Sequence, residues 1–248
     1  MLKIHRRLRW DLFDKMNVKR YLLYTIGEVL LVMIGLLLAI QLNSWDLNRI
    51  NRLTEKQYLE RLSDELKSEI EIYSKVRDKF IEKEKRLKRI IQIWQSGNKS
   101  ITDSLHYIND FKWGGNIGPW FLEPVTWNQL IQTGELKLLR DHKLVDELYY
   151  HNNLAKGIAD NYLMHPMQMT NRAREVWIEP FLYENIDIVI DTGEVSVVPS
   201  PEVYEIIWKN KEMYLKLYME IVFISKMQHQ QLQSIIDSGQ KLLKLLPH

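Results

Sequence analysis

Residues 21–42 read YLLYTIGEVLLVMIGLLLAIQL and constrain how the rest of this chain can be arranged. The stretch holds one charged residue, Glu28, and positions 29–40 carry no polar side chain. At a rise of about 1.5 Å per residue, a helix of this length reaches roughly 33 Å, close to the bilayer hydrocarbon thickness of about 30 Å. The pattern predicts a membrane-spanning helix, because helices of soluble cores rarely run this long without a polar face.

The flanks of this stretch indicate its orientation. Residues 1–20 carry seven Lys or Arg and two Asp, whereas residues 46–65 carry four basic and five acidic residues. Positive charge is retained on the cytoplasmic side, so we expect a cytoplasmic N-terminus and an extracytoplasmic C-terminal region. The apolar stretch exceeds the core of a signal peptide and no small-x-small cleavage pattern follows Ala39, which predicts a signal anchor that is not removed.

Three segments follow from this division: a basic arm over residues 1–20, a transmembrane helix over 21–45, and an extracytoplasmic helical domain over 46–248. The arm is interpreted as an interfacial helix on anionic lipid, with a disordered basic tail as the alternative.

Residues 21–248 contain 27 Lys and Arg and 30 Asp and Glu, and this slightly negative net charge excludes a nucleic-acid binder. The chain has no Cys, which excludes disulfides and thiolate chemistry. The lipid bilayer is therefore the first predicted partner.

Two blocks of sequence carry a family resemblance. They are YLLYTIGEVLLVMIGLLLAIQLNSWD at residues 21–46 and TWNQLIQTGELKLLRDHKLVDELYYHNN at residues 126–153. Together they resemble an uncharacterised bacterial family of single-span membrane proteins known only as a domain of unknown function. Asp46 and Leu47 depart from the family, in which Asn and Glu are commoner after the Trp. The resemblance implies a single-pass protein of the bacterial inner membrane with a periplasmic domain, and it carries over no catalytic residue or cofactor.

Beyond residue 46 the apolar spacing is helical. Apolar residues recur every three or four positions from Leu59 to Trp94, interrupted by Glu69 and Lys83, and SGNKS at 96–100 ends the pattern. This long helix fits either a coiled-coil stalk between protomers or one member of an intramolecular bundle. We favour the bundle, because the later amphipathic helices need a partner.

The middle of the chain alternates between short helices and one aromatic loop. We expect a short helix up to Lys112 and then a loop without regular structure over Trp113–Trp127, WGGNIGPWFLEPVTW. The glycines of this loop lack the strand and the Lys-Ser/Thr pair of a phosphate-binding loop. Its aromatic residues are predicted to cover an end of the bundle, with a partner-binding aromatic patch as the alternative. The next predicted helices are 126–132, stopped by Gly134, and one from Asp141 to Trp177 with a kink at Pro166.

The C-terminal part predicts a small insertion and a long helix. Residues 186–190 and 195–198 are β-type runs that should pair as a hairpin, and Pro201 opens a final helix that packs antiparallel to residues 55–95. The predicted fold class is all-α: a single N-terminal transmembrane helix followed by an extracytoplasmic long-helix bundle with a small β-hairpin insertion.

The strongest candidate site lies within the apolar stretch. An ionised carboxylate in hydrocarbon costs on the order of 3 kcal/mol, so Glu28 is expected to be neutralised, paired or turned into a protein interface. At 100° per residue, Glu28, Gly35 and Ala39 lie in one stripe, and a small-xxx-small pair permits close helix contact. These residues predict an intramembrane interaction site in a homo-oligomer or with another envelope protein. The alternative is a carboxylate that handles protons or ions.

Three further sets of residues have structural explanations that we favour. Asp191-Thr192-Gly193 matches the aspartic-protease tripeptide, but one copy in a helical chain reads as a hairpin turn. Met164, His165, Met167 and Met169 could bind Cu(I), although Met more often fills gaps around a broken helix. Glu147 and His151 lie one helical turn apart and make neither a zinc nor a di-iron motif, so a surface pair is expected.

We therefore predict a non-enzymatic, membrane-anchored envelope protein that acts in assembly or protein–protein interaction, with no metal or cofactor. Two alternatives remain from the sequence. One is an ion-coupled subunit of a membrane complex that works through Glu28, and the other is a periplasmic sensor of a metal or a small ligand.

Overall fold

The computed structural model describes residues 18–99, 104–116, 121–178, 187–189, 194–196 and 201–246. The chain divides into two compact units, Met1–Gln57 and Tyr58–His248. Helix α2, Val18–Ser96, contributes to both of them. Most of the predicted basic arm lies outside the described residues.

The described part of the first unit is helical and leaves its apolar side chains uncovered. From Leu22 to Leu53 every side chain except that of Thr25 is exposed, including Leu31 and Trp45 at 74% and 69%. Among the residues that the structure describes, one helix is long and apolar enough to cross a membrane by length and composition, and it is this one. A continuous apolar surface of this extent is unusual for a protein surrounded by water.

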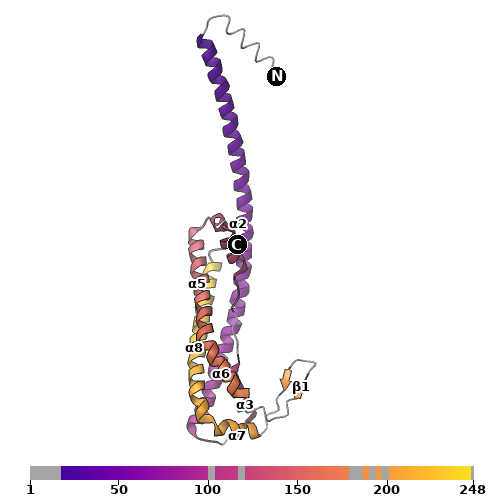
Figure 1. Ribbon diagram of the computed structural model, residues 1–248, viewed down its shortest axis with the longest axis vertical. Helices are drawn as coiled ribbons and strands as arrows, with labels where there is room; N and C mark the ends of the chain where they lie inside the picture. The colour runs from indigo at the N-terminus through magenta and orange to yellow at the C-terminus, as the bar shows by residue number, and fades with distance from the viewer. Residues whose placement is uncertain are drawn as a thin grey trace. The chain divides into compact units, whose positions relative to one another are not determined.

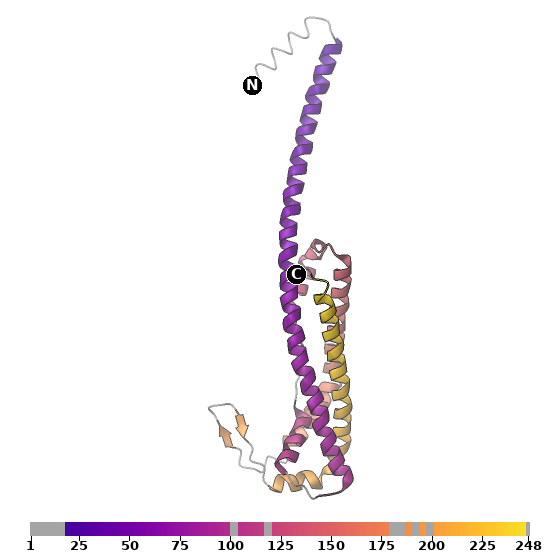
Figure 2. The ribbon, with the colours of Figure 1, turned by 180° about the vertical axis from the view of Figure 1, so that it is seen from behind.

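The second unit is a helical bundle. Its main members are α2 from Tyr58 onward, α5 (His142–Met164) and α8 (Lys211–Leu243), which lie side by side in Figures 1 and 2. Arg77 contacts Gln233 at 2.7 Å and Glu84 contacts His229 at 2.9 Å. Residue numbers therefore fall along α8 in the direction in which they rise along α2, and the two helices are antiparallel. The predicted antiparallel packing of the last long helix on residues 55–95 is confirmed.

Helix boundaries follow the capping residues of the sequence. Gly97 and Gly134 adopt left-handed φ angles of 67° and 68° immediately after α2 and α4 (Val125–Thr133), where a side chain would be strained. The Asp141 carboxylate accepts hydrogen bonds from the backbone N–H groups of Lys143 and Leu144 and so caps α5. Helix α6, Pro166–Ile178, begins with the predicted proline after a break at His165.

Two predicted segments differ from the structure. Helix α3 (Ser104–Lys112) is followed by a 3-10 turn, η1 (Trp113–Gly115), and α4 already begins at Val125, so the aromatic segment is not irregular throughout. The predicted final helix is two helices, α7 (Pro201–Lys209) and α8, which meet at Asn210. No Pro or Gly marks that break, which is why the apolar stripe alone missed it. A second 3-10 turn, η2 (Glu135–Leu138), follows α4.

Two three-residue strands, β1 (Asp187–Val189) and β2 (Glu194–Ser196), pair antiparallel with Ile188 opposite Val195. Residues 190–193 lie outside the described part, and with them the whole Asp191-Thr192-Gly193 tripeptide. A hairpin inserted in the bundle therefore stays a prediction.

The core of the second unit consists of three clusters along its length. The predicted stripe of α2 supplies all three, and its members Leu62, Tyr73 and Leu87 are buried in successive clusters. The cluster that we call the aromatic end is built on Trp94, Tyr107, Phe111, Tyr214 and Tyr218. Its rings are in direct contact: Trp94 and Phe111 lie 5.2 and 5.1 Å from Tyr218, centroid to centroid.

Candidate functional site

The residues of the predicted intramembrane site are all uncovered. Glu28, Gly35 and Ala39 lie in the exposed part of α2. A Cβ atom built on Gly35 would meet nothing within 4 Å. The stripe thus has room for a second helix, and whether one occupies it stays a prediction.

His151 lies in the interior of the second unit, and the prediction of a surface pair with Glu147 is wrong. Only 3% of His151 is exposed, and its Nε2 lies 3.2 Å from Oε2 of Glu69 on α2. Glu147 instead accepts a hydrogen bond from Lys241 at 2.5 Å. A Cβ on Gly239 of α8 would lie 3.1 Å from the side chain of Ile70 and 3.5 Å from the imidazole of His151, so α8 packs closely on α2 beside this ring.

A second carboxylate of α2 organises the start of α4. Glu65 accepts hydrogen bonds from the backbone N–H and the hydroxyl of Thr126, at 3.0 and 2.6 Å. The first N–H groups of a helix lack intrahelical partners and carry partial positive charge, so a carboxylate there is stabilising. Nearby, the hydroxyl of Tyr73 accepts from the N–H of Leu122 at 3.3 Å. These contacts position residues 121–127 against α2.

A pocket of about 680 Å³ is bounded by α2, residues 121–124, the start of α4, and α5. Its acidic lining residues are Glu65, Glu69 and Glu123, and its apolar walls include Leu62, Leu66, Phe121, Trp127 and Leu148. The volume is within the range of small-molecule sites. His151 also lines it; its Nε2 contacts Glu69, and its Nδ1 is buried without a hydrogen-bond partner among the described residues.

Lys83 is the buried cation that the sequence pattern did not single out. It interrupts the apolar stripe of α2, yet only 1% of it is exposed, and its Nζ donates to the backbone carbonyl of Asn116 at 2.9 Å. Burial, together with the charge of Arg174, lowers the pKa of Lys83 from 10.5 to about 7. Arg174 itself donates to the carbonyl of Gly115 at 2.7 Å. The two cations thus donate hydrogen bonds to the backbone carbonyl groups of Asn116 and Gly115, which follow α3.

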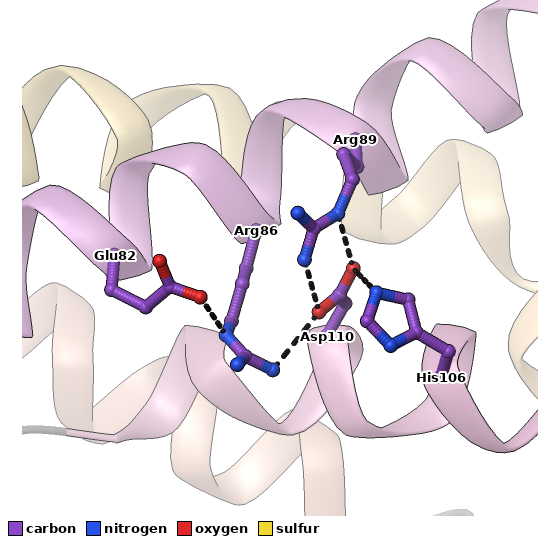
Figure 3. Close-up of polar contacts among 5 residues, drawn as sticks. All are labelled: Glu82, Arg86, Arg89, His106 and Asp110. Carbon is purple, nitrogen blue, oxygen red and sulfur yellow. Dashed lines mark hydrogen bonds and ion pairs between the residues drawn. The ribbon is translucent and has the colours of Figure 1, made fainter.

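Asp110 is the buried centre of a charge cluster between α2 and α3, whose other members are partly exposed (Figure 3). Arg89 donates to both of its carboxylate oxygens at 2.8 and 2.9 Å, and Arg86 donates to one of them at 3.2 Å. Nε2 of His106 lies 3.6 Å from the same carboxylate, and Glu82 accepts from Arg86 at 2.7 Å. The bond to Asp110, together with some charge from Glu82, raises the pKa of Arg89 above its ordinary value against the lowering effect of burial. This closed network fastens α3 to α2.

The Met-rich segment does not converge on one point. Met164 is 71% exposed, Met167 packs on the middle core cluster, and Met169 packs on the aromatic end. His165 contacts Glu220 at 2.9 Å instead of a methionine. Within the described ranges, no three His, Asp or Glu side chains are grouped to hold a metal ion. These positions give a metal sensor no support.

No family model, curated protein or solved structure matches this chain.

Proposed function

We propose that this chain is a single-span membrane protein whose helical C-terminal unit acts in assembly or protein–protein interaction, without catalysis. One observation carries the proposal: the apolar side chains of residues 22–42 are exposed, while the second unit buries a core of its own. Lipid is the solvent that makes such an exposed apolar helix favourable. The charge bias of its flanks and the family resemblance support the bacterial inner membrane, with residues 1–20 cytoplasmic and the second unit periplasmic.

The interaction surface within the membrane is the stripe of Glu28, Gly35 and Ala39. Hydrocarbon gives no hydrophobic drive for helices to associate, so small residues and polar side chains supply the contact. A carboxyl group that hydrogen-bonds across a helix pair also avoids being left unpaired in lipid. The protein would then tether its periplasmic unit in a homo-oligomer or to another envelope protein.

The test is the mass of the full-length protein purified in mild detergent, together with the identity of co-purifying proteins. Gly35→Leu is expected to reduce the oligomer to monomers, because a side chain would separate the backbones. Gly27→Leu is the matched control, since Gly27 is also unobstructed but lies about 100° from Glu28 around the helix. A wild-type monomer without companions contradicts the assembly role. A protein that remains dispersed without detergent contradicts the membrane span.

Orientation has its own test. Protease added to the outside of spheroplasts is expected to digest the second unit and to spare an N-terminal tag. Protection of the second unit contradicts a periplasmic location.

A second candidate is ion coupling through Glu28, the only charged residue between positions 22 and 42. Glu28→Gln keeps the size and hydrogen-bonding capacity of the side chain but cannot ionise. Loss of proton flux into proteoliposomes with an unchanged oligomer mass would favour this role. Loss of the oligomer would favour packing.

A further inference from the structure

The pocket of the second unit has the size and walls of a small-molecule site. Its volume of about 680 Å³ is lined by residues of α2, α4 and α5 and by the segment 121–124. Phe121, Trp127 and Tyr73 contribute aromatic surface, and Leu62 and Leu66 contribute aliphatic surface. Such walls favour an apolar body, and aromatic faces also attract cations.

The charge of the pocket is negative. Three carboxylates line it, against one ammonium group, and that group on Lys156 pairs with Asp160 at 2.9 Å. A bound anion would be repelled by this lining, whereas a cation would be attracted.

Two of the carboxylates keep free acceptor capacity. Glu69 uses Oε2 for His151, and Oε1 has no hydrogen bond to any described residue. The Glu123 side chain has no hydrogen bond within the described part of the chain, and it is exposed. Because a carboxylate has about four acceptor positions, these two residues can receive a donor from a ligand without losing their present contacts.

We propose that this pocket binds a small organic cation with an apolar body, such as an aromatic or aliphatic amine. The ammonium group would lie between Glu69 and Glu123, and the apolar part would lie against the aromatic walls. A docked protein is less suitable: a stable interface needs about 800 Å² from each partner, and only Leu122 and Val125 among the large apolar lining residues are exposed.

The test uses three probes that share a phenyl ring and differ in charge: phenethylamine, 2-phenylethanol and phenylacetate. Each is titrated into the full-length protein in an uncharged detergent, with empty micelles subtracted, and binding is followed by saturation-transfer NMR. Phenethylamine is expected to bind at least tenfold more tightly than the alcohol, and phenylacetate is expected not to bind. Equal binding of the three probes overturns the proposal.

Variants of the lining residues test whether the probes bind in this pocket. Glu69→Gln and Glu123→Gln are each expected to weaken phenethylamine several-fold, and Ala155→Trp is expected to block all probes by filling the pocket. Asp64→Asn is the matched control, because it removes one charge from the same helix outside the pocket, at a side chain that is 81% exposed. Since Glu123 has no hydrogen bond in the described structure, its variant keeps the test valid even if Glu69→Gln loosens the bundle.

Two results would overturn the assignment. One is unchanged phenethylamine binding in both Glu variants and in Ala155→Trp. The other is tighter binding of a trilysine peptide than of phenethylamine, which would assign the acidic lining to a basic protein segment.

Discussion

The cluster at Asp110 and the pocket near His151 bury charge in opposite ways, although both are built on α2. Asp110 accepts from two arginines and lies beside a histidine, and its side chain is 3% exposed. At the pocket, Glu69 keeps one oxygen without a hydrogen bond in the described structure and is 16% exposed. A carboxylate that is shielded from water needs hydrogen-bond partners for its charge. Both oxygens of Asp110 have such partners, whereas Glu69 is more accessible to water and retains capacity for a ligand.

The largest expected effect is at Asp110. Asp110→Ala removes the shared acceptor of Arg86 and Arg89, and we expect the free energy of unfolding to fall by about 3 kcal/mol. Urea unfolding of the full chain in mild detergent, followed by circular dichroism, measures the change. Asp64→Ala, which breaks an exposed pair with Lys67, is expected to cost less than about 0.5 kcal/mol. Similar costs for the two variants would contradict the distinction between the buried and the exposed pair.

Lys83 is expected to make the bundle more stable as pH rises. Its pKa is about 7 in the folded chain and near 10.5 when unfolded, so between these values the unfolded chain binds more protons. Stability then increases with pH, by about 2 kcal/mol between pH 7 and 9. Above pH 10 the trend reverses, because burial, aided by the charge of Glu69, raises the pKa of Tyr73 to about 12 while the unfolded tyrosine ionises.

Lys83→Met isolates this contribution. The variant keeps an unbranched side chain of similar length, and its unfolding free energy is expected to be nearly constant from pH 7 to 9. Lys85→Met, at an exposed position of the same helix, is the control and should retain the wild-type rise. A flat wild-type profile would mean that Lys83 stays protonated in the folded chain.

The sequence predicted helices and their boundaries better than it predicted which side chains contact one another between helices. Apolar spacing located the helices, and Gly134, Asp141 and Pro166 located their boundaries, because these signals act within a few residues. In the sequence, Lys83 and Glu69 appeared only as charged residues that interrupt the apolar stripe from Leu59 to Trp94. The partner of Glu69 is 82 residues away, and no local pattern states which side chain a helix places opposite another. Polar residues at stripe positions were the available signal for both.

Two glycines differ in how closely neighbouring side chains approach them. A Cβ on Gly114 would lie 2.8 Å from the ring of Tyr218, whereas nothing lies within 4 Å of one on Gly157, in the α5 segment beside the pocket. Gly114→Ala is expected to destabilise by about 1 to 2 kcal/mol through overpacking. Gly157→Ala is expected to stabilise by up to about 1 kcal/mol, because Ala favours helix more than Gly does. Urea midpoints of the two variants should move in opposite directions, and movement in the same direction would contradict the difference in packing.

The smallest effect is expected at Glu65. Glu65→Gln keeps an acceptor for Thr126 but removes the charge at the start of α4, so we expect a loss of about 0.5 to 1 kcal/mol in urea unfolding. Thr126→Val, which removes only the hydroxyl contact, is the control for the hydrogen bond without the charge. If Glu65→Gln cost as much as Asp110→Ala, Glu65 would be committed to folding as fully as Asp110. Glu65 would then serve the fold alone, and the attraction of the pocket for a cationic ligand would rest on Glu69 and Glu123.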